Sequence, residues 1–142
     1  MEFTIIDSTT GPHSIYTNNV VADFLYQHLE QYGDKKEDIL KCLNYVFDKG
    51  GFITVGHDNS TIKGIVVIND TGMQGYIPEH ILVYIAVDGS TRGQGFGGKL
   101  MEKVLNTCKG DVALHVEPDN PAKRLYERMG FTNKYLEMRY VK

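Results

Sequence analysis

The sequence has few cysteines, no long apolar run and no excess of basic residues. Its two cysteines, Cys42 and Cys108, each occupy an apolar position of a helix-like pattern, which favours buried thiols in a reducing compartment over a disulfide framework. The longest apolar run, residues 81–87, is far shorter than the ~20 residues of a transmembrane helix. The N-terminus has neither the basic nor the apolar segment of a signal peptide. We therefore expect a cytoplasmic protein that does not enter a membrane.

The charge balance is slightly acidic. The chain carries 15 lysines and arginines against 18 aspartates and glutamates, a net charge of -3, which provides no basic field for non-specific nucleic-acid binding. We therefore expect no DNA or RNA partner. We also expect no metal, because the histidines are scattered without metal-ligand spacing. They are His13, His28, His57, His80 and His115.

Length and composition favour one folded domain. A chain of 142 residues is long enough for one substantial core and too short for two. Apolar residues make up 42% and charged residues 23% of it, far from the composition of a disordered protein. We therefore expect a single domain over residues 1–142.

Apolar periodicity predicts a mixture of strands and helices. Asp34 is the expected N-cap of the second helix and Asn120 that of the last, with Pro121 at its first position. The order is β, α, α, three strands and then αβαβ, which predicts a mixed sheet flanked by helices. We expect strands over residues 2–7, 51–57, 61–69, 80–87, 111–117 and 135–141, and helices over 21–32, 35–49, 100–108 and 121–129.

The glycine-rich stretch TRGQGFGGKL, residues 91–100, fits or nearly fits three phosphate-binding patterns. A P-loop would need a hydroxyl for Mg²⁺ where Leu100 stands, so that interpretation fails at a functional atom. The dinucleotide fingerprint is met by Gly93, Gly95 and Gly98, with Glu117 as a possible ribose contact. This interpretation is disfavoured because residues 88–92 separate the preceding strand from the first glycine, whereas the fingerprint should follow its strand directly.

The third pattern is Arg-x-x-Gly-x-Gly, met by Arg92, Gly95 and Gly97. Glycines at the start of a helix let backbone N–H groups converge on an anion, where the helix dipole also favours negative charge. No metal is required for this arrangement. The pattern therefore suits a pyrophosphate that is held by backbone alone, although a tight turn without a ligand is the structural alternative.

Two segments together resemble the GNAT superfamily of N-acetyltransferases. They are VYIAVDGSTRGQGFGGKLMEKVL, residues 83–105, and LHVEPDNPAKRLYERMGF, residues 114–131. The clear resemblance covers residues 81–131. Residues 50–68 are similar to the family's β2–β3 hairpin, and residues 1–49 agree in element order alone. The resemblance implies a mixed α/β fold, with a central, mostly antiparallel twisted sheet of six to seven strands flanked by about four helices.

The resemblance also implies roles for particular residues. The main-chain amide of Val87 would donate to the thioester carbonyl oxygen, and Tyr126 would protonate the departing thiolate, as a phenol can at pH 7. Asn120 would contact the pantetheine arm, or serve only as a helix cap. The residues expected to bind the cosubstrate acetyl-CoA are Ala86, Val87, Arg92, Gly93, Gln94, Gly95, Phe96, Gly97, Gly98, Asn120, Lys123 and Tyr126.

The general base is the least defined part of the expected site. The alternation of a β-strand places Ile81, Val83, Ile85 and Val87 on one face, and the first three offer no titratable group. Glu79 is the favoured candidate, and a water relay is the alternative. His80, His115 and Glu117 are the other candidates near the expected slot.

The sequence thus favours an acetyl-CoA-dependent N-acetyltransferase. A primary amine of a small molecule or protein would attack the thioester directly in a ternary complex, since neither cysteine is placed as a covalent nucleophile. One alternative is a non-catalytic acyl-CoA-binding module of the same fold. A second is a nucleotide or dinucleotide binder that uses Glu117. The sequence carries no motif for a particular acceptor, and both a monomer and a homodimer are compatible with it.

Overall fold

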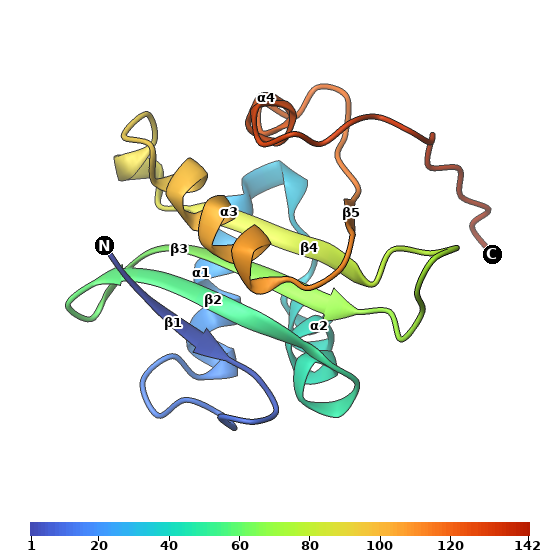
Figure 1. Ribbon diagram of the computed structural model, residues 1–142. Coiled ribbons are helices and arrows are strands. Elements are labelled where there is room, and N and C mark those ends of the chain that lie inside the picture. The colour runs from blue at the N-terminus through green and yellow to red at the C-terminus, as the bar shows by residue number, and fades with distance from the viewer.

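The computed structural model describes residues 1–142 and contains a five-stranded sheet in the order β1-β2-β3-β4-β5 (Figure 1). The strands are β1 (Glu2–Ile6), β2 (Gly51–Asp58), β3 (Thr61–Asp70), β4 (His80–Val87) and β5 (Val112–Leu114). The α-helices are α1 (Asn18–Leu29), α2 (Lys36–Asp48), α3 (Phe96–Thr107) and α4 (Lys123–Arg128). Two short 3-10 helices, η1 (Glu30–Tyr32) and η2 (Gly89–Thr91), follow α1 and β4.

The sheet is antiparallel from β1 to β4 and parallel between β4 and β5. The predicted hairpin of β2 and β3 is confirmed, with Asn59 at φ 54 in its turn. Asparagine tolerates this left-handed backbone better than most residues. None of the helices has both the length and the apolar composition that crossing a membrane requires.

Helices cover both faces of the sheet, and each face has its own apolar core. α1 and α2 pack on one face through residues such as Leu25 and Leu43, which are fully buried. α3 and α4 pack on the other face through Leu100 and Tyr126. Figure 1 shows α1 and α2 behind the sheet and α3 in front of it. The amphipathic helices therefore bury their apolar stripes on a sheet that is apolar on both sides.

A β-bulge in β4 changes which side chains share a face. Val67 of β3 pairs with Tyr84, but the next residue of β3, Ile68, pairs with Leu82, so Val83 is the extra residue. Leu82 lies in the core under α3, whereas Tyr84 lies in the core under α1 and α2. The expected regular alternation along β4 is therefore wrong, because a bulge inverts the side-chain parity of the strand that contains it.

The chain after α4 also differs from the prediction. Residues 135–141 were expected to form a closing strand, but residues 132–142 contain no regular structure. The sheet accordingly has five strands in place of the expected six to seven. A strand needs a hydrogen-bonded partner, and alternating apolar residues alone do not supply one. The tail is exposed and runs away from the sheet in Figure 1.

Smaller differences concern the ends of elements. β5 ends at Leu114, several residues before the predicted end, and α4 begins at Lys123, after a turn that contains Pro121. Lys35 occupies the N-cap position of α2 without a side-chain bond. The prediction of Asp34 as that cap is therefore wrong, because its carboxylate bonds to Tyr84 instead.

Candidate active site

The parallel strands β4 and β5 separate after a short stretch of pairing. Their last paired residues are Leu82 and Leu114, and β4 continues from there to Val87 without a partner on that side. We call residues 83–87 on this side the open edge of β4. Such an edge exposes backbone N–H and C=O groups that no sheet partner satisfies.

The amide of Val87 faces the open edge. The next amide, that of Asp88, donates to the carbonyl oxygen of Lys63 in the opposite direction, at 2.9 Å. Backbone groups of successive strand residues point to opposite sides, so the N–H of Val87 points away from β3. Ala86 differs from it. Its side chain is buried and its backbone groups face β3, which leaves it no group to offer a cosubstrate.

A row of unpaired backbone donors lies at the start of α3. The N–H groups of Gly93, Gly95, Phe96, Gly97 and Gly98 donate to no backbone or side-chain acceptor. The amides at positions 92 and 94 instead donate within the loop, over 3.5 Å and 3.3 Å. Free amides at a helix N-terminus favour an anion, because the helix dipole is positive there.

Glycine is favoured at different positions of this loop for different physical reasons. Gly93 and Gly95 adopt φ 85 and φ 80, which favours glycine over residues with a side chain. Gly97 lets α3 approach its neighbours, since a Cβ there would lie 3.2 Å from Leu125 and 3.7 Å from Val87. Gly98 has neither reason, because its φ is not left-handed and a Cβ would meet nothing within 4 Å. The space beside Gly98 is open to a ligand.

Asn120 and Lys123 border a hollow that is lined by the loop between β5 and α4 and by α4 itself. The side-chain oxygen of Asn120 accepts a hydrogen bond from the amide of Ala122 at 2.9 Å. The side-chain nitrogen has no partner in the protein. The side-chain oxygen of Asn120 therefore stabilises the turn before α4, while the side-chain nitrogen keeps two free N–H donors.

Tyr126 lies in the core under α3, next to Phe131. Burial raises the pKa of its phenol to about 12, so the hydroxyl is protonated at neutral pH. This hydroxyl bonds to no protein group, yet it is not sealed from solvent. A buried tyrosine usually has a hydrogen-bond partner, so a free hydroxyl here is available to a ligand.

Arg92 is anchored to the connection between α1 and α2. One of its nitrogens lies 3.2 Å from the carboxylate of Glu30, and the other donates to the carbonyl oxygen of His28 at 3.1 Å. The side chain of His28 in turn accepts from the amide of Gly89 at 3.4 Å. The side chain of Arg92 therefore lies against the end of α1 and η1, where both of its terminal nitrogens are already paired.

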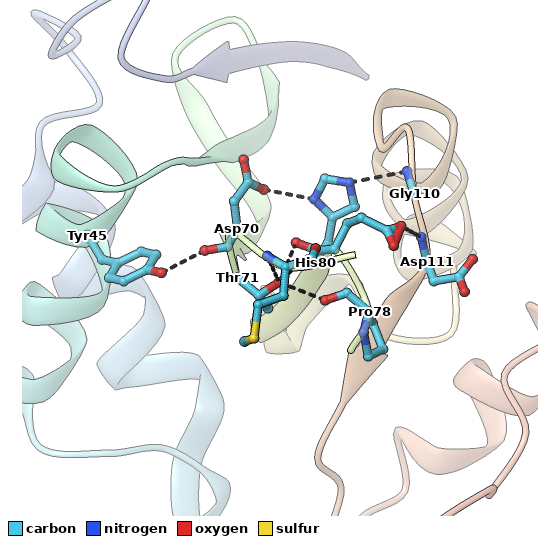
Figure 2. Close-up of polar contacts among 9 residues, drawn as sticks. Tyr45, Asp70, Thr71, Pro78, His80, Gly110 and Asp111 are labelled. Carbon is cyan, nitrogen blue, oxygen red and sulfur yellow. Dashed lines mark hydrogen bonds and ion pairs between the residues drawn. The ribbon is translucent and has the colours of Figure 1, made fainter. Parts of the chain in front are cut away.

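Glu79, the favoured base of the sequence analysis, directly precedes β4 and belongs to a polar network at the end of that strand away from Val87. Figure 2 shows Asp70, His80, Gly110 and Asp111 of this network. The carboxylate of Glu79 accepts from the amide of Asp111 at 2.8 Å. His80 connects Asp70, at 2.8 Å, to the amide of Gly110, at 3.3 Å. Val87 is eight positions after Glu79, about 26 Å of extended chain at ~3.3 Å per residue. This geometry disfavours direct proton transfer by Glu79 or His80 to a group at Val87.

The other candidate bases are exposed, and no described contact places them at the open edge. His115 and Glu117 follow β5, and neither side chain makes a hydrogen bond or ion pair within the chain. Glu117 is also distant from the glycine-rich loop in the sequence and makes no hydrogen bond with it. The structure thus brings together Val87, the start of α3 and α4, and it does not bring a titratable base to them from β4 or β5.

The cysteines are unpaired and lie on opposite sides of the sheet. Cys42 packs against the core under α1 and α2, and Cys108 against the core under α3. Burial raises the pKa of the Cys42 thiol to about 12 and that of Cys108 to about 11. Neither thiol has the lowered pKa of a catalytic nucleophile.

Sequence reasoning missed one short contact. The hydroxyl of Tyr84 donates to the carboxylate of Asp34 at 2.6 Å, across fifty residues of chain. Only the bulge at Val83 turns Tyr84 toward α1 and α2. No local sequence pattern marks such a bulge here, so the pair was not predictable.

An open strand edge beside a helix that begins with free amides is an arrangement suited to acyl transfer from a large anionic carrier. The family described as acetyltransferase (GNAT) domain matches residues 48–133, which is more than half of the chain. The chain therefore belongs to the GNAT family of acetyltransferases, as its motifs indicate.

One curated relative and several solved structures agree with this assignment. The 5-NmdU N-acetyltransferase of Pseudomonas phage PaMx11 is 32% identical over 84 residues, a match that spans 58% of this chain and 58% of the relative. A ribosomal-protein-alanine N-acetyltransferase from Brucella melitensis biovar Abortus 2308 has a TM-score of 0.67 at 13% identity, with 100% of both chains covered. The aminoglycoside N-acetyltransferase AAC(6')-Iy, solved in complex with CoA, has a TM-score of 0.70 at 15% identity, covering 99% of this chain and 93% of that one. At such identities the two structural similarities concern the fold.

Proposed function

We propose that this protein is an acetyl-CoA-dependent N-acetyltransferase and that residues 1–142 act as one GNAT domain. The observation that carries this proposal is the row of unpaired amides at the start of α3, directly beside Val87 at the open edge of β4. The amides of Gly93, Gly95 and Gly98 would hold the pyrophosphate of the cosubstrate. No protein atom occupies the space beside these glycines.

The bound cosubstrate supplies an acetyl group activated as a thioester. The amide of Val87 stabilises negative charge that develops on the carbonyl oxygen, a contribution of ~3 kcal/mol for one well-placed donor. As the C–N bond forms and the C–S bond breaks, the hydroxyl of Tyr126 gives its proton to sulfur. The amine nitrogen loses two protons in the whole reaction, one replacing the proton of Tyr126 and one leaving to solvent.

Other residues would bind and orient the cosubstrate. The free side-chain nitrogen of Asn120 would donate to an amide carbonyl of the pantetheine arm, while its oxygen keeps the turn before α4. Lys123 carries no ion pair in the protein and borders the same hollow, so it is available to a phosphate. Direct attack by the amine is favoured over an acyl-enzyme, because both thiols are buried and protonated. Unpaired thiols also fit a cytoplasmic location.

The acceptor would be a primary amine. The phage relative suggests 5-NmdU as the first compound to test, and the structural neighbours suggest an aminoglycoside and a peptide with N-terminal alanine. A non-catalytic acyl-CoA-binding module is the second candidate, because no carboxylate or imidazole of β4 or β5 contacts the region of Val87.

Thermal unfolding with acetyl-CoA, NAD⁺ and Mg-ATP tests the first half of the proposal. A ligand at ~100 times its dissociation constant stabilises by ~2.7 kcal/mol, which raises the midpoint by several degrees. A shift with acetyl-CoA alone is expected. A shift with NAD⁺ or Mg-ATP in its place would contradict the proposal. Thiol release with the three amines then separates an enzyme from a binding module, which would show none.

A further inference from the structure

The part of the chain that carries Tyr126 is attached to the rest of the protein at few points. We call residues 112–131 the β5–α4 segment. Its strand β5 lies at the edge of the sheet and pairs with β4 through 3 residues. Beyond that pairing, one side-chain hydrogen bond joins the segment to another part of the chain, from the hydroxyl of Tyr32 to the carbonyl oxygen of Asp119 at 3.2 Å. Apart from packing under α3, the position of α4 therefore depends on how β5 is held against β4.

His80 holds the connection between α3 and β5 through its imidazole ring. Its Nε2 atom accepts from the amide of Gly110 at 3.3 Å, and its Nδ1 atom lies 2.8 Å from the carboxylate of Asp70 (Figure 2). Because a carboxylate only accepts, Nδ1 carries the ring hydrogen and Nε2 offers its lone pair to the amide. The side chain of His80 is 13% exposed, so water competes little for either bond.

Asp70 is fixed from the side opposite to His80. Its carbonyl oxygen accepts from the hydroxyl of Tyr45, on α2, at 2.6 Å (Figure 2). Its amide donates to the carbonyl oxygen of Gly50, directly before β2, at 3.1 Å. A series of bonded residues thus runs from α2 through the end of β3 to the start of β5, and His80 is the link that reaches β5.

Glu79 reaches the same connection but is held differently. Its carboxylate accepts from the amide of Asp111 and bonds to no other group. A Cβ at position 110 would overlap this carboxylate, so the close approach requires glycine. The side chain of Glu79 can follow the connection if it moves, because nothing holds it from another side. The ring of His80 lies between two partners and cannot move with one without losing the other.

We propose that His80 is a positioning residue of the reaction, one that fixes where β5 begins against β4 and thereby where Tyr126 lies relative to Val87. This inference rests on the proposed function. β4 and β5 diverge from the end that His80 holds, so a small rotation of β5 there displaces α4 by a larger distance. A proton donor must lie within hydrogen-bond reach of its acceptor, and a misplacement of ~1 Å can cost about 100-fold in rate.

Amide hydrogen exchange of the full chain tests the anchoring without any substrate. His80→Ala should speed exchange at residues 112–114 roughly 10-fold, the loss expected for one hydrogen bond, while β2 and β3 keep their wild-type rates. Asp70→Ala leaves His80 in place but frees its ring, and should act in the same direction. His80→Gln should restore the wild-type rates, because an amide can both donate to Asp70 and accept from Gly110. Gln74→Ala is the matched control, since Gln74 borders the hollow beside His80 without a side-chain hydrogen bond.

Turnover gives a readout that a purely structural role would not move. With an amine that supports thiol release, His80→Ala should lower kcat roughly 10-fold or more. The affinity for acetyl-CoA should change little, because the glycine-rich loop is not attached to β5. His80→Gln should recover kcat.

Two kinds of failure are distinguishable. Unchanged exchange at residues 112–114 in His80→Ala and Asp70→Ala, or an equal acceleration throughout the sheet, would overturn the inference. A wild-type kcat in His80→Ala would overturn it too. Failure of the wild type to bind acetyl-CoA, or to release thiol with any of the amines, would instead refute the proposed function, and the exchange rates would still test the anchoring by His80.

Discussion

The guanidinium of Arg92 and the carboxylate of Glu30 lie 3.2 Å apart, so the loop after β4 is joined to the connection between α1 and α2. Glu30 has a left-handed backbone, at φ 55, which is uncommon for a residue with a side chain. The resemblance to GNAT enzymes suggests that Arg92 binds phosphate. The structure adds that Glu30 competes for the same cation.

Arg92→Ala is therefore expected to weaken acetyl-CoA binding, whereas Glu30→Gln should leave it unchanged or strengthen it. Both side chains are more than half exposed, at 51% and 55%, so the pair contributes little to stability. Calorimetric titration with acetyl-CoA measures the affinities. An unchanged affinity in Arg92→Ala would show that this side chain only anchors the connection.

Gly98→Ala separates ligand binding from folding. A Cβ at this position meets no protein atom and the residue is helical, so alanine should stabilise the fold by up to about 1 kcal/mol. The same methyl group would occupy space beside the free amides and should weaken acetyl-CoA binding roughly 10-fold. Gly89→Ala is the control, because it too faces open space but its amide is bonded to His28. Normal affinity in Gly98→Ala would contradict the assignment of the loop.

Gly95→Ala should behave differently from Gly98→Ala. Gly95 adopts φ 80, so alanine there is strained in the folded protein whether or not a ligand is bound. A destabilisation of about 1 kcal/mol in urea unfolding is expected. An unchanged stability would show that the loop relaxes, and a binding defect in this variant alone would not identify a phosphate site.

Tyr126→Phe should lower kcat by roughly 100-fold with an unchanged affinity for acetyl-CoA, because the hydroxyl acts as the thiolate leaves. The thermal midpoint should stay close to that of the wild type, since the hydroxyl bonds to no protein group. Turnover equal to that of the wild type would show that Tyr126 serves only in the core.

Stability should fall at alkaline pH. The pKa of Cys42 is raised to about 12 and that of Tyr126 to about 12, both by burial. The unfolded chain releases these protons first, so their contribution is complete below about pH 9 and is lost as the pH rises toward 12. Urea unfolding at pH 7 and pH 10.5 measures this loss. A free energy of unfolding that does not decrease at pH 10.5 would argue against buried thiol and phenol groups.

Glu79→Ala should destabilise the protein by about 1 kcal/mol and leave kcat unchanged. Its carboxylate accepts one hydrogen bond from Asp111, which the variant would lose. Glu79 lies at the opposite end of β4 from Val87, where its carboxylate bonds to the amide of Asp111, so it makes no contact with the region of Val87. A large loss of kcat with normal acetyl-CoA affinity would restore Glu79 as a candidate base.

Local patterns in the sequence determined much of this protein. The apolar spacing of α1, α2 and α3, the hairpin of β2 and β3, and the buried strand β4 were all predictable, because each depends on residues close together in the chain. The glycines of residues 93–98 and the two GNAT segments also indicated the family. These features specify backbone conformation, which short stretches of sequence encode directly.

Only the tertiary structure decided which side chains meet. The bulge at Val83 is set by the register between β3 and β4, and it turns Tyr84 toward Asp34. The pairing of Arg92 with Glu30 likewise joins residues far apart in the chain. The tail after α4 has the alternation of a strand but no partner strand. Contacts between distant residues depend on packing and register, which no local pattern contains.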